Sequence, residues 1–287
     1  MVVSIISKMA TVASMISFKF GKKDSFDKRK YDLECAEKKI VIIIPSYNNA
    51  KWCMQTLDSV RNQHYENFQI IYINDNSSDT TAQQVETYIK EHALENKCML
   101  INNIKRVGAF ENLYNAIYMC DNDSIVATLD GDDQLAHPYV LKILNSVYQD
   151  PQVWLTYGQF RVFPGGKIWY CTTFSDNTIK NNAFRKTDFL VSHLRTFYAG
   201  LFKLIKKEDL LYDGAFYPMS WDKAMMAPMI EMAGNRFKYI RDILYLYNNA
   251  NPINDHKVDI AFQTHLNQLI LQKRPYKPVD WQDVMTV

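Results

Sequence analysis

Apolar runs alternate with amphipathic segments along residues 39–135, and this alternation limits the folds open to the chain. The runs KIVIIIPS, FQIIYIND, KCMLIN and SIVATLD are rich in β-branched residues and predict buried strands. The segments 50–63, 79–93 and 108–120 between them predict helices. Together they predict an α/β fold with a mixed, mostly parallel central sheet that is flanked by helices on both faces.

Each predicted strand ends in polar residues: PSYNN, NDNSSD, NNIKRVG and DGDD. Parallel strands bring their carboxyl ends to one edge of the sheet, where ligands of such folds bind. The last end is the most unusual, because Asp130, Asp132 and Asp133 lie within four positions. Like charges this close raise one another's pKa, so the cluster predicts a bound cation. Dipole capping of a following helix would explain one carboxylate but not three.

Composition narrows the class of partner. The 287 residues are 47% hydrophobic, enough for one large core, and the formal charge of +2 does not indicate a nucleic-acid partner. The 5 cysteines are scattered without a CxxC pair, so neither a disulfide framework nor a zinc site is predicted. This usage is typical of a reducing cytoplasm.

The strand ends PSYN, DNSSD and DGDD, in this order, resemble those of the family 2 glycosyltransferases of the GT-A fold. The match is close over residues 39–140 and looser to about 250. It implies a single Rossmann-like domain that transfers a sugar from a nucleotide-diphosphate donor. Asn74 stands where the family usually has the first Asp of a pair, and Asp75 keeps the position that reads the base. UDP is favoured from Asp75 alone. The nucleotide-sugar site would include Pro45, Ser46, Tyr47, Asn48, Asp75, Asp130 and Gly131.

The acidic cluster fits such a donor, because Mn²⁺ or Mg²⁺ held by one or two carboxylates neutralises a departing diphosphate. Asp132 is the best direct ligand. Asp130 would contact the ribose or bind the metal through water, and Asp133 would orient the ligands. In several enzymes of the GT-A fold a late His completes the metal shell. His256, after NPIND, is the candidate here, and a surface His is the equal alternative.

The segment NNIKRVGAFENL adds cations to the same edge. Gly108 allows a tight entry into the next helix, and Lys105 or Arg106 could reach the donor, with a solvated basic loop as the alternative. The resemblance favours Arg106.

The second half is less regular. A hairpin or a flexible lip over the site is predicted around Pro164. The aromatic segment HLRTFYAGLFKLI is expected to pack in the core, with Arg195 near a diphosphate as the sharper hypothesis. The segment FKYIRDILYLYNN predicts two short strands. Asp222 follows Trp221 at the start of a predicted helix, where it is either a first-turn acid or the general base that the family has at this place. Asp213 is the next candidate for that base.

These patterns divide the chain into an N-terminal helix and linker over 1–38, a catalytic domain over 39–255 and a C-terminal helix and tail over 256–287. Residues 39–135 would bind the nucleotide sugar and 136–255 the acceptor. The apolar stretch 9–18 is too short to span a bilayer, so we expect a cytoplasmic protein, with weak peripheral membrane association through 1–38 as the alternative.

The sequence thus predicts an inverting, metal-dependent transferase acting on a glycan, lipid-linked or protein acceptor. The sugar, the acceptor and the oligomeric state stay open. A catalytically inactive nucleotide-sugar or carbohydrate-binding relative is the main alternative. A dehalogenase-like phosphatase would need its DxD on the first strand, and a nucleotidylyltransferase would need a Gly-rich, Arg-containing loop where PSYNNAKW stands.

Overall fold

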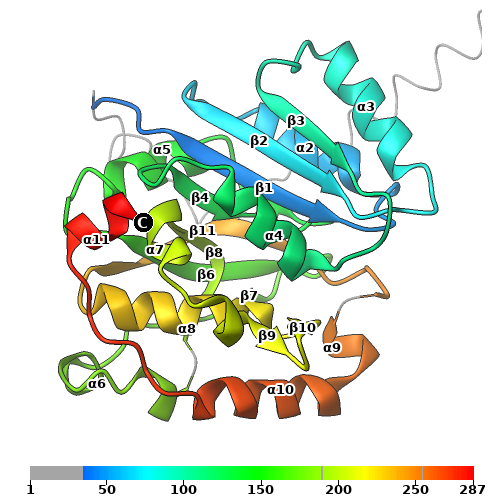
Figure 1. The fold of residues 1–287 in the computed structure, drawn as a ribbon. Helices are drawn as coiled ribbons and strands as arrows, with labels where there is room; N and C mark the ends of the chain where they lie inside the picture. The colour runs from blue at the N-terminus through cyan, green and yellow to red at the C-terminus, as the bar shows by residue number, and fades with distance from the viewer. Residues whose placement is uncertain (1–34, 189, 254) are drawn as a thin grey trace, which may run out of the picture. The chain divides into compact units, whose positions relative to one another are not determined.

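One twisted sheet organises the protein (Figure 1). Its strand order is β3-β2-β1-β4-β8-β6-β11-β5, with β7 paired to the side of β6. The computed structural model describes residues 35–188, 190–253 and 255–287, apart from the side chains of 255 and 256. The predicted segment 1–38 therefore lies almost wholly outside the described residues. In the described part of the chain, no helix is both long and apolar enough to cross a bilayer.

The first half alternates strand and helix as predicted. Its elements are β1 (Ile40–Ser46), α2 (Cys53–Arg61), β2 (Phe68–Asn74), α3 (Thr81–Glu91), β3 (Cys98–Asn102), α4 (Ala109–Tyr118), β4 (Ile125–Thr128), β5 (Gln134–Leu135) and α5 (Val140–Val147). Strands β3, β2, β1 and β4 are parallel. All seven residues of β1 are buried between β2 and β4, which explains the uninterrupted apolar run. The prediction of a mostly parallel sheet with flanking helices is confirmed.

The second half completes the sheet with mixed pairing. It contains β6 (Leu155–Phe163), β7 (Ile168–Trp169), α6 (Asp176–Lys180), η2 (Phe184–Lys186), β8 (Ser192–Tyr198), α7 (Ala199–Lys203), η3 (Lys207–Leu210), β9 (Leu211–Tyr212), β10 (Ala215–Phe216), α8 (Trp221–Ala233), β11 (Phe237–Asn248), α9 (Asp255–Val258), α10 (Ile260–Gln272) and α11 (Trp281–Thr286). Strand β8 is antiparallel to both β4 and β6, whereas β11 is parallel to β6. The sheet is therefore mixed where the two halves meet.

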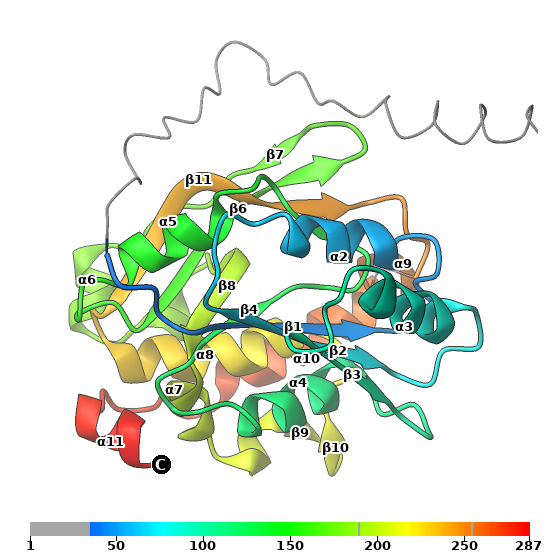
Figure 2. The same cartoon turned by 90° about the horizontal axis from the view of Figure 1, so that it is seen from above.

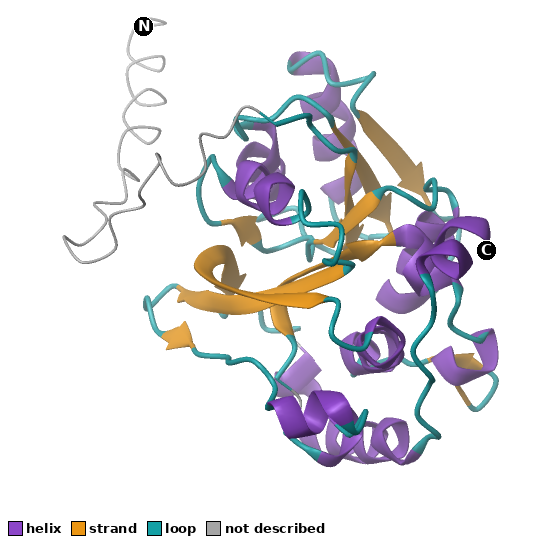
Figure 3. Cartoon of the chain, turned by 90° about the vertical axis from the view of Figure 1, so that its left-hand side faces the viewer, coloured by secondary structure: helices purple, strands orange, loops and turns teal. Residues whose placement is uncertain are grey.

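Helices cover both faces of the sheet. Helices α2 and α5 lie on one side and α4, α7 and α8 on the other (Figure 2), and the twist of the strands between these layers is visible in Figure 3.

All five cysteines are free. Burial raises the pKa of the Cys98 thiol to about 12, so this thiol is protonated and inert at neutral pH.

Two predictions concern the strands of the second half. The hairpin around Pro164 is confirmed, because β6 and β7 pair antiparallel with Phe160 opposite Trp169. The prediction of two short strands over FKYIRDILYLYNN is wrong, since β11 is one continuous strand. Its register against β6 shifts between Ile240 and Ile243 and again before Tyr245. Such bulges let a strand pass the polar Arg241 and Asp242 without ending.

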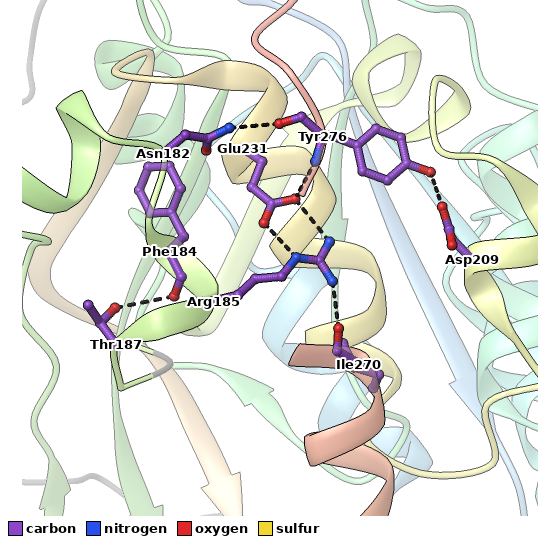
Figure 4. Close-up of polar contacts among 8 residues, drawn as sticks. All are labelled: Asn182, Phe184, Arg185, Thr187, Asp209, Glu231, Ile270 and Tyr276. Atoms are coloured by element: carbon purple, nitrogen blue, oxygen red, sulfur yellow. Dashed lines mark hydrogen bonds and ion pairs between the residues drawn. The ribbon is translucent and has the colours of Figure 1, made fainter. Parts of the chain in front are cut away.

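The C-terminal segment is fixed to the domain by a buried ion pair (Figure 4). Arg185 donates to both carboxylate oxygens of Glu231 at 2.6 and 2.9 Å, and its third nitrogen donates to the carbonyl of Ile270 at 2.6 Å. The main-chain N–H of Tyr276 also donates to Glu231, at 2.9 Å. The two charged side chains are 5% and 0% exposed. One pair thus joins η2, α8, α10 and the chain that follows α10.

We predict that Glu231→Gln lowers the free energy of unfolding by about 3–5 kcal/mol, because the buried Arg185 charge would lose its counter-ion. Urea unfolding followed by circular dichroism measures the change. The matched control is Glu86→Gln, which removes an exposed pair with Lys90 and should leave the midpoint where it is. Equal midpoints for the two variants would contradict the assigned role of the buried pair.

Candidate active site at the carboxyl edge of the sheet

The turn after β1 is tied to the loop after β2 by hydrogen bonds. The N–H of Asn48 donates to Ser77 Oγ at 2.9 Å, and the Asn48 side-chain oxygen accepts from the N–H of Ser78 at 2.9 Å. Asn48 has a φ of 52°, a left-handed conformation that Asn adopts more readily than most residues. The N–H of Ala50 donates to Asp79 at 3.0 Å. These contacts give Asn48 a structural role at the rim, and its predicted contact with the donor stays a prediction.

The acidic turn after β4 packs directly on this first turn. The N–H of Gly131 donates to the carbonyl of Pro45 at 3.2 Å. A Cβ atom at position 131 would lie 2.7 Å from the Cβ of Ser46, so only glycine fits without displacing the backbone. The structure therefore brings Pro45, Ser46 and Gly131 together, as their predicted place at one edge requires.

Asp75 orders the third loop. Its Oδ1 accepts from Asn103 Nδ2 at 2.8 Å and from the N–H of Val107 at 3.0 Å, and its Oδ2 accepts from the N–H of Gly108 at 2.8 Å. Burial raises the pKa of Asp75, but these hydrogen bonds outweigh it and the net pKa lies below its ordinary value. A carboxylate has about four lone-pair positions, so these bonds leave room for roughly one further donor.

Two predicted donor contacts from separate motifs lie against each other. The guanidinium of Arg106 is 3.8 Å from the centre of the Tyr47 ring, within the range of a cation–π interaction. Arg106 is exposed and Tyr47 is half-buried, so both side chains remain accessible at the rim. Gly108 begins α4 with a φ of 92°, which explains why glycine stands there.

Asp133 is the buried member of the acidic cluster. Its side chain accepts from the Tyr245 hydroxyl at 2.6 Å and from the N–H of Asn248 at 2.6 Å. Burial, together with the charges of Asp132 and Asp130, raises the pKa of Asp133 well above its ordinary value. Both oxygens are engaged, so Asp133 joins the acidic turn to the end of β11.

Asp130 and Asp132 are only half-buried, in contrast to Asp133. Asp132 accepts from Asn251 Nδ2 at 2.8 Å. Burial raises the pKa of Asp132 above its ordinary value, although the Asn251 hydrogen bond and the charge of Lys257 oppose the rise. The Lys257 ammonium donates to the carbonyl of Asn251 at 3.0 Å. Asn251 and Lys257 therefore place a hydrogen bond and a positive charge beside the Asp132 carboxylate.

The cluster supplies oxygen ligands, which Mg²⁺ and Mn²⁺ prefer. Within 35–188, 190–253 and 255–287, no set of three or more His, Cys, Asp or Glu side chains is arranged to hold a metal. A pair of carboxylates still fits, because such ions commonly take one or two carboxylates with the phosphates of the substrate. The side chain of His256 is outside the described residues.

The candidate base, Asp222, lies in the first turn of α8 and pairs with a buried arginine. Arg195 Nη2 donates to Asp222 Oδ2 at 2.9 Å, and the two side chains are 5% and 30% exposed. The pair places Arg195 beside the candidate base. The predicted contact of Arg195 with a diphosphate stays a prediction.

A chain of contacts links this pair to the acidic cluster. Arg195 Nη1 lies 3.2 Å from His193 Nδ1, and the His193 ring stacks on Tyr245 with centroids 4.3 Å apart. Burial and the Arg195 charge lower the pKa of His193 well below its ordinary value, so the imidazole is neutral and Nδ1 accepts from Arg195. Because Tyr245 in turn donates to Asp133, the chain runs from Asp222 to the DGDD turn.

Tyr245, Asn251 and Lys257 belong to this edge but were not predicted from the sequence. Tyr245 lies in an apolar strand segment that is typical of core packing, and Asn251 lies in an Asn-rich loop more than a hundred positions from Asp132. No local spacing marks such a contact. The Asn-rich loop after a buried strand was the only feature of the sequence that pointed to Asn251.

Comparisons with known proteins give a family and a fold. The family model described as glycosyl transferase family 2 matches residues 41–211. Glycosyltransferase GlyG of Streptococcus pneumoniae is 20% identical over 221 residues, which cover 74% of this chain and 71% of GlyG. The structure of S. aureus TarS 1-349 in complex with UDP-GlcNAc aligns with a TM-score of 0.61 at 18% identity, over 81% of this chain and 65% of that one.

The mannosyltransferase PcManGT of Pyrobaculum calidifontis, in complex with GDP-Man and Mn²⁺, aligns with a TM-score of 0.55 at 19% identity, over 86% of this chain and 71% of that one. The chain spans only 34% of another curated relative, a glycosyltransferase of Haemophilus influenzae. The structural likenesses show the same fold, and the family model covers more than half of the sequence. The chain belongs to glycosyl transferase family 2.

Proposed function

We propose that the protein is an inverting, divalent-metal-dependent glycosyltransferase that moves a sugar from a nucleotide-diphosphate donor to an acceptor hydroxyl of a glycan or glycoconjugate. The observation that carries the proposal is the contact chain from Asp222 through Arg195, His193 and Tyr245 to Asp133. It links Asp222, a carboxylate outside the acidic cluster, to the turn that carries Asp130 and Asp132. Such a separation lets one group accept a proton while the others bind the donor.

The donor would lie along the turns after β1, β2 and β4. The Tyr47 ring and the Arg106 guanidinium provide a flat surface and a cation for the nucleotide and its phosphates. The remaining acceptor position of Asp75 suits an N–H of the base, which is why UDP is our favoured nucleotide. TarS was solved with UDP-GlcNAc and PcManGT with GDP-Man, so relatives of this fold bind both kinds of donor.

Asp130 and Asp132 would hold the divalent metal together with the donor diphosphate. A bound Mn²⁺ or Mg²⁺ neutralises the charge that develops on the departing nucleotide. PcManGT was solved in complex with GDP-Man and Mn²⁺, which supports this choice of ion. Asp133 has both oxygens engaged by the protein, so its role is to position the turn that carries the other two.

Asp222 would be the general base. As the acceptor oxygen forms its bond to the anomeric carbon, Asp222 takes the hydroxyl proton and the bond to the diphosphate breaks, with the electron pair leaving on the nucleotide. The described contact with Arg195 engages Oδ2, which leaves Oδ1 for the acceptor. One displacement without an enzyme nucleophile inverts the anomeric configuration.

The metal assignment predicts a change in both turnover and stability. Asp132→Asn should abolish donor turnover and also the rise in melting temperature that Mn²⁺ gives the wild type. The metal-free melting temperature should not fall, because the substitution removes one charge from a repelling group. Calorimetry with Mn²⁺ and with EDTA measures the melting temperatures with and without metal. Full turnover of the wild type in EDTA would exclude the metal role.

His256 gives a separate prediction. If its imidazole completes the metal shell, His256→Ala should raise the Mn²⁺ concentration that gives half-maximal activity. The measurement is a titration of activity against Mn²⁺ at saturating donor. An unchanged titration curve would remove His256 from the site without affecting the roles of Asp130 and Asp132.

The base assignment predicts that Asp222→Asn lowers kcat by about 10²–10⁴-fold. The KM for the donor should stay near that of the wild type. The melting temperature should fall somewhat, because Arg195 is buried and loses its anionic partner.

The matched control for Asp222→Asn is Asp213→Asn, at the exposed β9–β10 turn, which should leave kcat unchanged. A large loss in Asp213→Asn with near-normal transfer by Asp222→Asn would move the base to Asp213. Donor binding with no turnover in the wild type would favour an inactive relative.

A further inference from the structure

A row of aromatic rings leads outward from the proposed site. It begins at Tyr245, which is fully buried against Asp133, and continues to His193, stacked on Tyr245 at 4.3 Å. The Phe160 ring follows at 5.4 Å from His193, and the Trp169 ring stacks on Phe160 at 6.1 Å with an angle of 5° between the planes. The row thus connects the DGDD turn to the β6–β7 hairpin.

Tyr247 widens this row. Its ring centre lies 5.3 Å from Phe160 and 6.0 Å from His193. Tyr245 and Tyr247 alternate with Leu246 along β11, so they project from the same face of the sheet. Phe160 and Trp169 are opposite one another in the antiparallel pair and share a face as well. Four strands therefore contribute rings to this row.

Exposure increases along the row. Tyr245 is 0% and His193 9% exposed, Phe160 and Tyr247 are half-buried, and Trp169 is 55% exposed. A Trp side chain with half of its surface in water forgoes stabilisation of the order of 1 kcal/mol or more that burial would give. Apolar surface of this kind, continuous with a polar site, is typical of ligand binding.

We propose that Phe160, Trp169 and Tyr247, here called the aromatic platform, bind pyranose rings of a glycan acceptor. The proposal rests on the proposed function. Aromatic faces carry a negative quadrupole and pack against the C–H groups of a sugar ring, which carry partial positive charge. A chain of sugars stacked on the platform would point its terminal hydroxyl toward Asp222 and the DGDD turn. The platform continues into His193, which contacts the Asp222 partner Arg195, and into Tyr245, which contacts Asp133.

The shape of the hairpin distinguishes a glycan from a lipid surface. Its tip consists of Pro164, Gly165, Gly166 and Lys167, without a large apolar side chain to enter a bilayer. Trp169 lies down the strand and stacks on Phe160 instead of projecting from the tip. The Lys167 ammonium, 5.9 Å from the Trp169 ring, leaves a polar group beside the platform for sugar hydroxyls.

The test measures saccharide binding separately from donor chemistry. Cellotetraose, chitotetraose and mannotetraose are titrated into the full chain, and binding is followed by saturation-transfer NMR. We expect at least one of them to bind the wild type and to bind Trp169→Ala at least tenfold more weakly. Trp169→Phe, which keeps a ring, should recover part of the affinity. Tyr118→Ala is the matched control, an aromatic that is 46% exposed on α4 and should bind as the wild type does.

Hydrolysis of UDP-sugars with Mn²⁺ should be unchanged in Trp169→Ala, because Trp169 belongs to β7 and no residue assigned to the donor or the metal lies on that strand. If the wild type does not hydrolyse UDP-sugars, the proposed function is wrong, whereas the result on saccharide binding is unaffected. The inference is overturned if none of the three tetrasaccharides binds the wild type, or if Trp169→Ala binds them equally well. It is also overturned if Trp169→Ala loses binding only to vesicles of phosphatidylcholine and phosphatidylglycerol, which would make the hairpin a membrane contact.

Discussion

The contact between Asp133 and the end of β11 determines how the two halves of the fold meet. A carboxylate that is 1% exposed needs hydrogen bonds to both oxygens, and it obtains them from the Tyr245 hydroxyl and the N–H of Asn248. Asp133 belongs to the turn that would bind the donor, while Tyr245 belongs to the row of rings that leads to the proposed acceptor surface. The geometry of one half is thereby fixed by a polar contact with the other.

The first half of the fold was predictable because its signals are local. Strand β1 is apolar from Ile40 to Pro45, because its neighbouring strands and the layers on both faces bury it, and each following helix shows amphipathic spacing. The polar strand ends then had to converge, and Gly131 against Ser46 shows how closely they do. Asp75 was selected by resemblance, but its bonds to Val107 and Gly108 depend on a loop geometry that no spacing reveals.

The second half was less predictable because its decisive contacts are long-range. The sequence predicted two short strands where β11 lies, whereas bulges against β6 keep the strand continuous. Arg195 and Asp222 are 27 positions apart, and the sequence marked each of them without indicating that they pair. Two buried or half-buried side chains of opposite charge become partners only when the sheet and α8 have assembled, so the pair is a property of the tertiary structure.

The charge balance at the acidic turn follows from the same packing. Three carboxylates near one another repel, and burial makes the repulsion stronger because the surroundings screen it less. The protein relieves it in part, through the Tyr245 hydroxyl at Asp133 and through Asn251 and Lys257 near Asp132. The pKa values of Asp132 and Asp133 remain raised, mainly because burial disfavours the charged carboxylates, and at Asp133 also because of the charges of Asp132 and Asp130. In the proposed function, a divalent cation would stabilise the charged form of these carboxylates, and the half-buried Asp130 and Asp132 would be the two that hold it.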